Sequence, residues 1–86
     1  MPSMDMRRLV GLNVRRLRMA AGLSQEELAV RAGLARPYIS GIERGQRNPT
    51  VIVLYEVATQ LGVDPRDLLD PGAEEAEGPR IVSKGR

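Results

Sequence analysis

The arginines of this chain carry most of the chemistry that its sequence offers, and they are unevenly placed. Residues 1–50 contain nine arginines and four acidic residues, whereas residues 51–86 contain four basic and seven acidic residues. The first half is therefore net +5 and the second half net −3. Guanidinium groups bind phosphate oxygens and base edges, so the basic half is a candidate surface for a polyanion. Arginines on ordinary solvated helix faces would give the same excess of positive charge.

The sequence offers few residues for metal binding, base stacking or catalysis. The chain contains no cysteine and no histidine, which excludes disulfides and the usual zinc sites, and no cofactor is expected. Tyr38 and Tyr55 are its only aromatic residues, too few for a protein that stacks single-stranded bases. No nucleophile–base pair can be assembled. The adjacent Glu26 and Glu27 suit helix capping better than acid–base catalysis, so an enzyme is the least supported class.

The basic half contains two short predicted helices joined by a tight turn. A capping box of Ser24 and Glu27 predicts a helix over residues 25–32. After the glycine-containing turn at 33–35, a helix with proline in its first turn is expected over 36–44. This is the form of a helix-turn-helix, although an ordinary helical hairpin would look the same from spacing alone. Four apolar side chains are expected to fill the angle between the two helices: Leu28, Ala29, Ile39 and Ile42.

Three further helices are expected, over residues 6–21, 51–61 and 65–69. We predict one helical domain over residues 1–70, followed by a flexible tail at 71–86 that is poor in apolar groups. Two apolar faces should help to form the core: Val10, Val14, Leu17 and Ala21 on the first helix, and Val51, Leu54, Val57, Ala58 and Leu61 on the fourth.

About residues 9–69 resemble the phage-repressor helix-turn-helix family, which includes Cro and lambda repressor and is also called Xre-type. This resemblance implies an all-α, compact, five-helix domain of the lambda-repressor type, whose third helix enters the major groove of duplex DNA. The matching stretches are Val14–Arg18, Gly22–Ala29, Ala32–Ala35, Tyr38–Ser40, Ile42–Gly45, Asn48–Thr50 and Leu61–Val63.

The resemblance also implies roles for individual residues. The base-reading positions would be Arg36, Pro37, Ser40 and Gly41, with Arg36 suited to the two acceptors of guanine. Proline and glycine there offer no side-chain hydrogen bond, which predicts few base contacts per subunit. Contacts to phosphate or sugar would come from Gln25, Tyr38, Arg44 and Arg47. Arg36 could instead bind phosphate, and Arg44 and Arg47 could be solvated surface. The family's ion pair between its first and third helices would be Arg18 with Glu43.

A second copy of the chain is an expected partner, because one short helix reads few bases. On the fourth predicted helix, Ile52 lies nearly opposite the core face and Tyr55 lies on its flank. We hypothesise a two-fold contact made by Ile52, Tyr55, Val63 and Leu69. A single exposed isoleucine on a monomer is the alternative.

Two functional classes remain for such a chain. The first is a sequence-specific regulator of transcription, a repressor or autoregulator, that binds double-stranded DNA, and a restriction-modification controller protein is a possibility within this class. The second is an antitoxin-type protein that binds a protein partner and uses DNA binding secondarily. No apolar run reaches the length of a membrane span, no membrane association is expected, and we expect a cytoplasmic protein.

Overall fold

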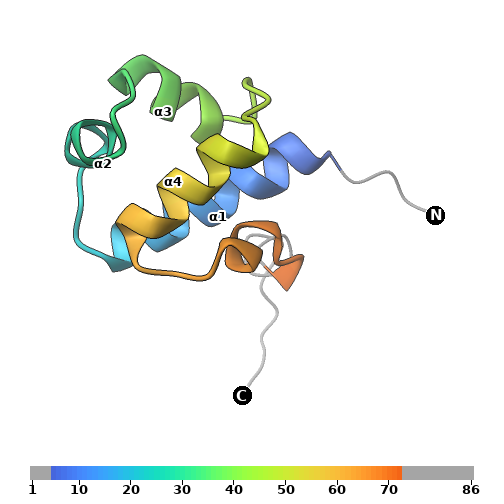
Figure 1. Ribbon diagram of the computed structural model, residues 1–86. Helices are drawn as coiled ribbons and strands as arrows, with labels where there is room; N and C mark the ends of the chain where they lie inside the picture. The colour runs from blue at the N-terminus through green and yellow to red at the C-terminus, as the bar shows by residue number, and fades with distance from the viewer. Residues whose placement is uncertain (1–4, 73–86) are drawn as a thin grey trace.

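The computed structural model describes residues 5–72, which are helical and contain no strand (Figure 1). This confirms the all-α fold and the number of helical elements. The last of them is a short 3-10 helix, and the residues expected to form the tail lie outside the described part of the chain from position 73 onward. In chain order the elements are α1 (Met6–Ala20), α2 (Gln25–Ala32), α3 (Arg36–Glu43), α4 (Val51–Leu61) and η1 (Pro65–Leu69).

Short polar side chains begin α2 and α4. The Ser24 hydroxyl accepts from the Glu27 N–H at 3.0 Å, and the Ser24 N–H donates to Glu27 Oε1 at 2.8 Å, which confirms the predicted capping box. The bond from the Ser24 N–H to its carboxylate holds the pKa of Glu27 below its ordinary value. Thr50 caps α4 in the same manner, accepting from the Val53 N–H at 3.1 Å. Local residue chemistry therefore fixes where both helices start.

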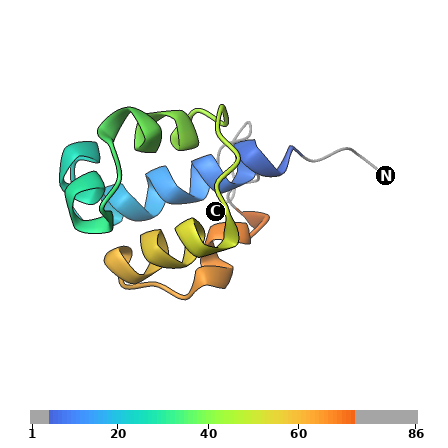
Figure 2. The ribbon, with the colours of Figure 1, turned by 45° about the horizontal axis from the view of Figure 1, so that its top comes forward.

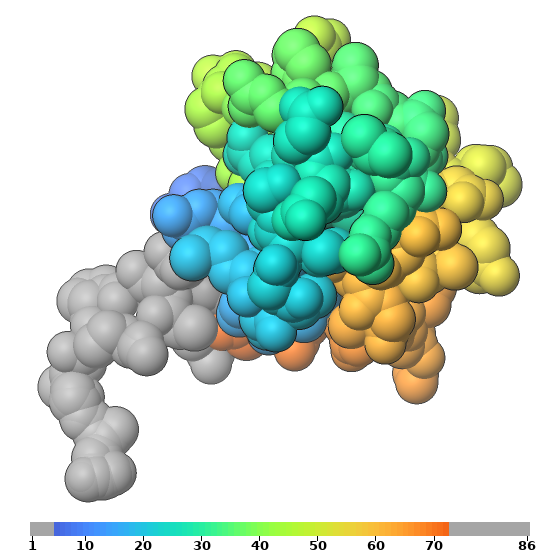
Figure 3. Space-filling view, turned by 90° about the vertical axis from the view of Figure 1, so that its left-hand side faces the viewer, coloured from blue at the N-terminus to red at the C-terminus, as the bar shows by residue number. Residues whose placement is uncertain are grey.

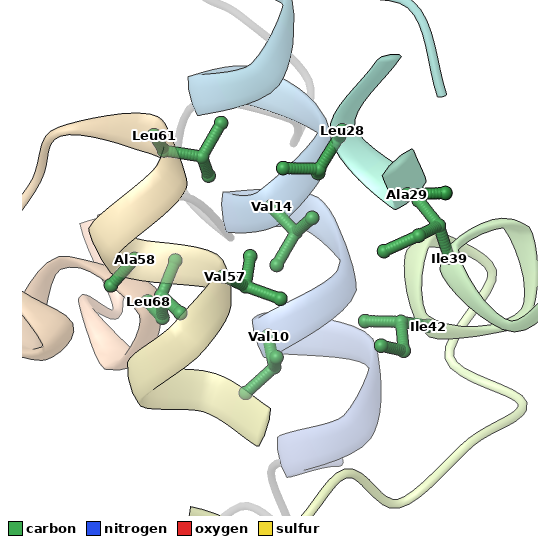
Figure 4. Packing of buried hydrophobic residues seen from close by; sticks show 10 residues of the cluster. All are labelled: Val10, Val14, Leu28, Ala29, Ile39, Ile42, Val57, Ala58, Leu61 and Leu68. Carbon is green, nitrogen blue, oxygen red and sulfur yellow. The ribbon is translucent and has the colours of Figure 1, made fainter. Parts of the chain in front are cut away.

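Helix α1 lies between the other elements. In Figure 2 it runs between α3 on one side and α4 on the other, and it also contacts η1. The core forms where these helices meet (Figure 4). The four side chains expected between α2 and α3 are all buried, which confirms that prediction. The buried cluster consists of Val10, Val14, Leu28, Ala29, Ile39, Ile42, Val57, Ala58, Leu61 and Leu68.

The predicted core face of α4 was wrong at Val51, which is 77% exposed. Val51 is the first residue of α4 and follows its N-cap, so it lies at the end of the helix, while the buried residues begin at Val57. Periodicity gave the correct side of the helix but not how far along it the core extends. The first helix shows the same effect, since Ala21 follows its last residue and is exposed.

Helices α1 and α3 approach each other closely at Gly11, which is buried. A Cβ atom added at Gly11 would lie 2.3 Å from the carbonyl oxygen of Ile42 and 2.8 Å from that of Glu43. Both neighbours are backbone atoms, which cannot swing aside as a long side chain can. Only glycine therefore allows this spacing of the two helices, and no local turn signal in the sequence indicated it.

Asn13 fixes the other side of α1 to the end of the helical domain. Its buried amide nitrogen donates to the carbonyl oxygens of Leu68 at 2.9 Å and Asp70 at 3.1 Å. Its amide oxygen accepts from Arg16 Nη2 at 2.9 Å. The amide satisfies carbonyl groups at the end of η1 that have no partner within that short helix.

We expect Gly11→Ala to lower the free energy of unfolding by about 2–3 kcal/mol, because a methyl group forced into packed backbone strains both helices. Urea denaturation followed by circular dichroism measures this change. Gly22→Ala is the matched control: its φ is +74° but nothing lies within 4 Å of the added Cβ. Gly22→Ala should lower the free energy of unfolding by only about 1 kcal/mol, because only its backbone conformation is strained. Equal losses for the two variants would contradict the close approach of α1 and α3.

Candidate nucleic-acid interface

The turn between α2 and α3 sets the angle at which α3 leaves the body of the protein. Gly33 has φ +71° and ψ +32°, the left-handed conformation that glycine adopts without a Cβ clash. The Leu34 N–H then bonds back to the carbonyl of Ala29 at 2.9 Å, which closes the end of α2. Because of this turn, α2 and α3 form one end of the molecule, with α3 along the upper edge of the face in Figure 3.

Helix α3 has an inner face held by the core and an outer face open to solvent. Ile39 and Ile42 are buried against the neighbouring helices. Arg36 and Pro37, in the first turn, are exposed, and Ser40 is half-buried. The first turn of α3 is therefore accessible to a large ligand, while the rest of the helix anchors it.

A buried ion pair connects α1 to the end of α3. Arg18 Nε lies 2.7 Å from Glu43 Oε2, and Arg18 Nη2 donates to Glu43 Oε1 at 3.1 Å. Only 12% of the Arg18 side chain and 3% of the Glu43 side chain are exposed. Arg18 Nη1 also donates to the carbonyl of Leu23 at 2.8 Å, and the bonds to Glu43 raise the pKa of Arg18 above its ordinary value. The pair thus links α1, the loop before α2, and α3.

Gln25 extends this network to the first residue of α3. Its amide nitrogen donates to Glu43 Oε1 at 3.0 Å, and its amide oxygen accepts from Arg36 Nη1 at 2.9 Å. The sequence indicated only a phosphate contact for Gln25 and no link to Arg36. Two residues separated by 11 positions meet here because the turn brings the starts of α2 and α3 together.

A second group of polar side chains lies along the far end of α3 and the loop after it. Arg44 is exposed and donates to Ser40 Oγ at 2.5 Å and to Gln46 Oε1 at 3.1 Å. The Ser40 hydroxyl, expected to meet a base, thus has a partner within the protein. The role of Gln46 was missed, since a glutamine in a polar loop gives no sequence signal of its partner.

The side chain of Arg47 covers the middle of α3. Its guanidinium carbon lies 5.7 Å from the centre of the half-buried Tyr38 ring, a cation–π distance. Gly41 is buried, and a Cβ atom added there would lie 2.8 Å from Arg47 Cγ. Gly41 was expected to allow a base edge to come close. In this structure the stem of Arg47 fills that space, so Arg47 would have to move first.

Exposed apolar side chains lie on α4 and at the end of η1. Ile52 is 70% exposed, Tyr55 and Leu69 are exposed, and Val63 is half-buried. Val51, wrongly expected in the core, adds to this exposed apolar area. A groove beside it is lined by Met6, Arg7, Val10, Asn48, Pro49, Leu54 and Leu69.

Residues 5–72 contain neither a metal site nor a membrane-spanning helix. No group of three or more acidic, cysteine or histidine side chains there is placed to hold a metal ion. Over the same residues, no helix combines the length and the apolar character that crossing a bilayer requires.

Comparison with known proteins gives consistent matches. The family model described as helix-turn-helix matches residues 14–68. The HTH-type transcriptional regulator y4dJ of Sinorhizobium fredii is 53% identical over 77 residues, which cover 90% of this chain and 100% of y4dJ. Control protein C.BamHI of Bacillus amyloliquefaciens is 45% identical over 67 residues, covering 77% of this chain and 83% of that protein.

A solved structure shows the same fold. The crystal structure of the restriction-modification controller protein C.AhdI from Aeromonas hydrophila superimposes with a TM-score of 0.70 at 47% sequence identity. The match covers 72% of this chain and 94% of that one.

Removal of one partner of the buried pair should destabilise the fold strongly. We expect Glu43→Ala to lower the free energy of unfolding by about 3 kcal/mol, because Arg18 keeps its charge without its carboxylate partner. Arg66→Ala is the control, since it breaks an ion pair with Asp64 in which the Arg66 side chain is 90% exposed. That change should have little effect on the free energy of unfolding, because water screens the pair. Thermal unfolding of both variants measures the difference, and similar losses would show that the Arg18–Glu43 pair contributes no more than a surface pair.

Proposed function

The chain belongs to the helix-turn-helix family, and from this we propose that it is a sequence-specific regulator of transcription that inserts α3 into the major groove of duplex DNA. The observation that carries the proposal is which residues of α3 are buried and which are exposed. Its inner face is packed into the core, whereas Arg36 and Pro37 at its start are exposed. A duplex is the target that fits, since a helix enters its major groove and arginines meet its phosphates. Such a protein would act in the cytoplasm of a bacterial cell.

We assign base reading to the outer face of α3. Arg36 extends from the first turn, where a guanidinium group reaches the O6 and N7 acceptors of guanine with two parallel bonds. Pro37, Ser40 and Gly41 complete the surface that would face the bases. Ser40 and Gly41 are covered by Arg44 and Arg47 in the free protein, so Arg36 and Pro37 are the side chains ready for contact.

We assign phosphate contacts to residues on either side of the base-reading surface. Gln25 lies at the N-terminus of α2, where unpaired N–H groups and the helix dipole favour an anion. Tyr38 would lie against phosphate or sugar. Arg44, directly after α3, and Arg47, in the loop that follows, are exposed cations. These contacts set affinity and register rather than sequence preference.

The apolar surface on α4 and η1 would join two copies of the chain. Ile52, Tyr55, Val63 and Leu69 would contact their equivalents across a two-fold axis, with Val51 as an addition from the structure. A two-fold dimer presents two α3 helices to two half-sites about 34 Å apart on one face of the duplex. This arrangement doubles the number of bases that the protein reads.

A restriction-modification controller is the second candidate function. It is favoured by the identity to C.BamHI and by the structural match to C.AhdI, both similar over more than two thirds of this chain. Selection of bound sequences from a random duplex pool tests both functions. Selected sites in front of restriction-modification genes would favour the controller, and sites in front of this gene alone would favour an autoregulator.

Duplex binding should weaken steeply with salt and respond differently to two arginine variants. Arg36→Ala should weaken the free energy of binding to the preferred duplex by about 1–3 kcal/mol and relax the base preference at one base pair. Arg47→Ala should weaken binding to all duplexes alike and reduce the slope of log K against log salt by about 0.9. Fluorescence anisotropy at several salt concentrations measures both. An unchanged consensus for Arg36→Ala would contradict its base-reading role.

Ile52→Glu should convert a dimer to a monomer, because two carboxylates would face each other across the two-fold axis. Val30→Glu is the control, since Val30 is 71% exposed but lies on α2. Sedimentation at high protein concentration distinguishes the two variants. A monomeric wild-type protein, or a dimer that survives Ile52→Glu, would remove the α4 surface as the dimer contact.

A further inference from the structure

Helix α1 carries positive charge on a face that points away from the core. Its 15 residues include five arginines and no acidic residue. Arg18 is neutralised by the buried Glu43. Arg15 and Arg16 are exposed, and no acidic side chain within residues 5–72 forms an ion pair with either of them. A partner that covers this side of α1 must therefore supply negative charge.

The exposed arginines of α1 share one side of the helix. At about 100° per residue, Arg8, Arg15 and Arg16 fall within a sector of about 100°, and we call these three residues the arginine face. Val10 and Val14 lie on the opposite side and are buried. At a rise of about 1.5 Å per residue, the arginine face is about 12 Å long.

The described part of the chain ends beside the arginine face. The buried Asn13 amide donates to the carbonyl of Asp70 at 3.1 Å and accepts from Arg16 Nη2 at 2.9 Å. The backbone of Asp70 is therefore separated from Arg16 by a single side chain. Gly72, the last described residue, donates its N–H to Asp70 Oδ1 at 2.9 Å, which keeps it close to the same place. The residues after Gly72 thus start next to α1.

The sequence after Gly72 has the complementary charge within reach. Residues 73–77 read Ala-Glu-Glu-Ala-Glu, and no basic residue occurs before Arg80. Five extended residues span up to about 17 Å, which exceeds the length of the arginine face. Three carboxylates can therefore be brought to three guanidinium groups. The carboxylates are those of Glu74, Glu75 and Glu77.

We propose that the arginine face of α1 is the docking site for the acidic segment 74–77 of the same chain, and that this docking shields the face from polyanions. A single exposed ion pair is weak, but the segment is held beside its site at a high effective concentration. Docking would also reduce repulsion among the arginines of α1. Nucleic acid would then meet the cations of α3 and its following loop without competition from a second basic surface. The proposal concerns a surface outside the DNA contacts assigned above.

A spin label on the acidic segment tests the docking. The chain contains no cysteine, so Ala76→Cys provides one labelling position in the intact protein. At low salt the label should broaden the NMR signals of α1 around Arg8 and Arg15. About 1 M salt should remove most of this broadening, because the Debye length falls to about 3 Å. The double variant Arg15→Gln/Arg16→Gln should remove it at low salt as well.

The double variant Arg31→Gln/Arg36→Gln is the matched control. It removes two charges from exposed residues of α2 and α3, and it should keep the wild-type broadening. Broadening that survives both high salt and Arg15→Gln/Arg16→Gln would reflect the tether alone and would overturn the proposal. Broadening of an unlabelled copy mixed with the spin-labelled one would place the segment on a second molecule, which contradicts docking within one chain.

Binding of inorganic polyphosphate tests the shielding. At low salt, neutralising the segment with Glu74→Gln, Glu75→Gln and Glu77→Gln should raise the affinity about threefold or more. Adding Arg15→Gln/Arg16→Gln should abolish this gain, whereas adding Arg31→Gln/Arg36→Gln should preserve it. An unchanged affinity, or a gain that persists without Arg15 and Arg16, would overturn the shielding. Polyphosphate has no bases, so these results do not depend on whether the protein recognises a DNA sequence.

Discussion

The buried contact between Arg18 and Glu43 is the constraint on which the exposed end of α3 depends. Helix α3 has eight residues, and an isolated helix of that length is not stable in water. Its position must therefore come from packing and from bonds to other elements. Ile39 and Ile42 supply apolar contacts, but these alone allow a short helix to rotate about its axis. Two charge-assisted bonds from Arg18 to Glu43, at the last residue of α3, remove that freedom.

The same pair explains why a charged group is found within the core of so small a domain. A carboxylate that is nearly inaccessible to water is costly unless its oxygens are satisfied, and those of Glu43 accept three bonds. The third of these comes from Gln25, which also accepts from Arg36. A structural ion pair and a recognition side chain thus belong to one network. Burial keeps the inner end of the network ordered, while its outer end lies in solvent.

The sequence predicted the features that short-range chemistry determines and missed those that depend on distant neighbours. The capping box at Ser24 and the glycine turn after α2 were predictable, because both are decided within a few residues. Periodicity also placed Ile39 and Ile42 in the core. It failed at Val51, because a repeat shows which side of a helix is apolar but not where the neighbouring helices end. The second bond of Gln25 and the packing of Arg47 over Gly41 were not predictable, since a long polar side chain selects its partners only in the folded protein.

Helix α1 connects the surface proposed for DNA with the surface proposed for a second copy. Gly11 and Asn13 are two residues apart, so at about 100° per residue they lie on nearly opposite sides of the helix. Gly11 allows the backbone of α3 to approach, whereas Asn13 bonds to the carbonyls of Leu68 and Asp70 around the end of η1. Displacing α3 relative to η1 would break contacts on one side of α1 or the other. Two copies joined through α4 and η1 would therefore hold their α3 helices at a fixed separation, and that separation would define which spacing of half-sites the protein accepts.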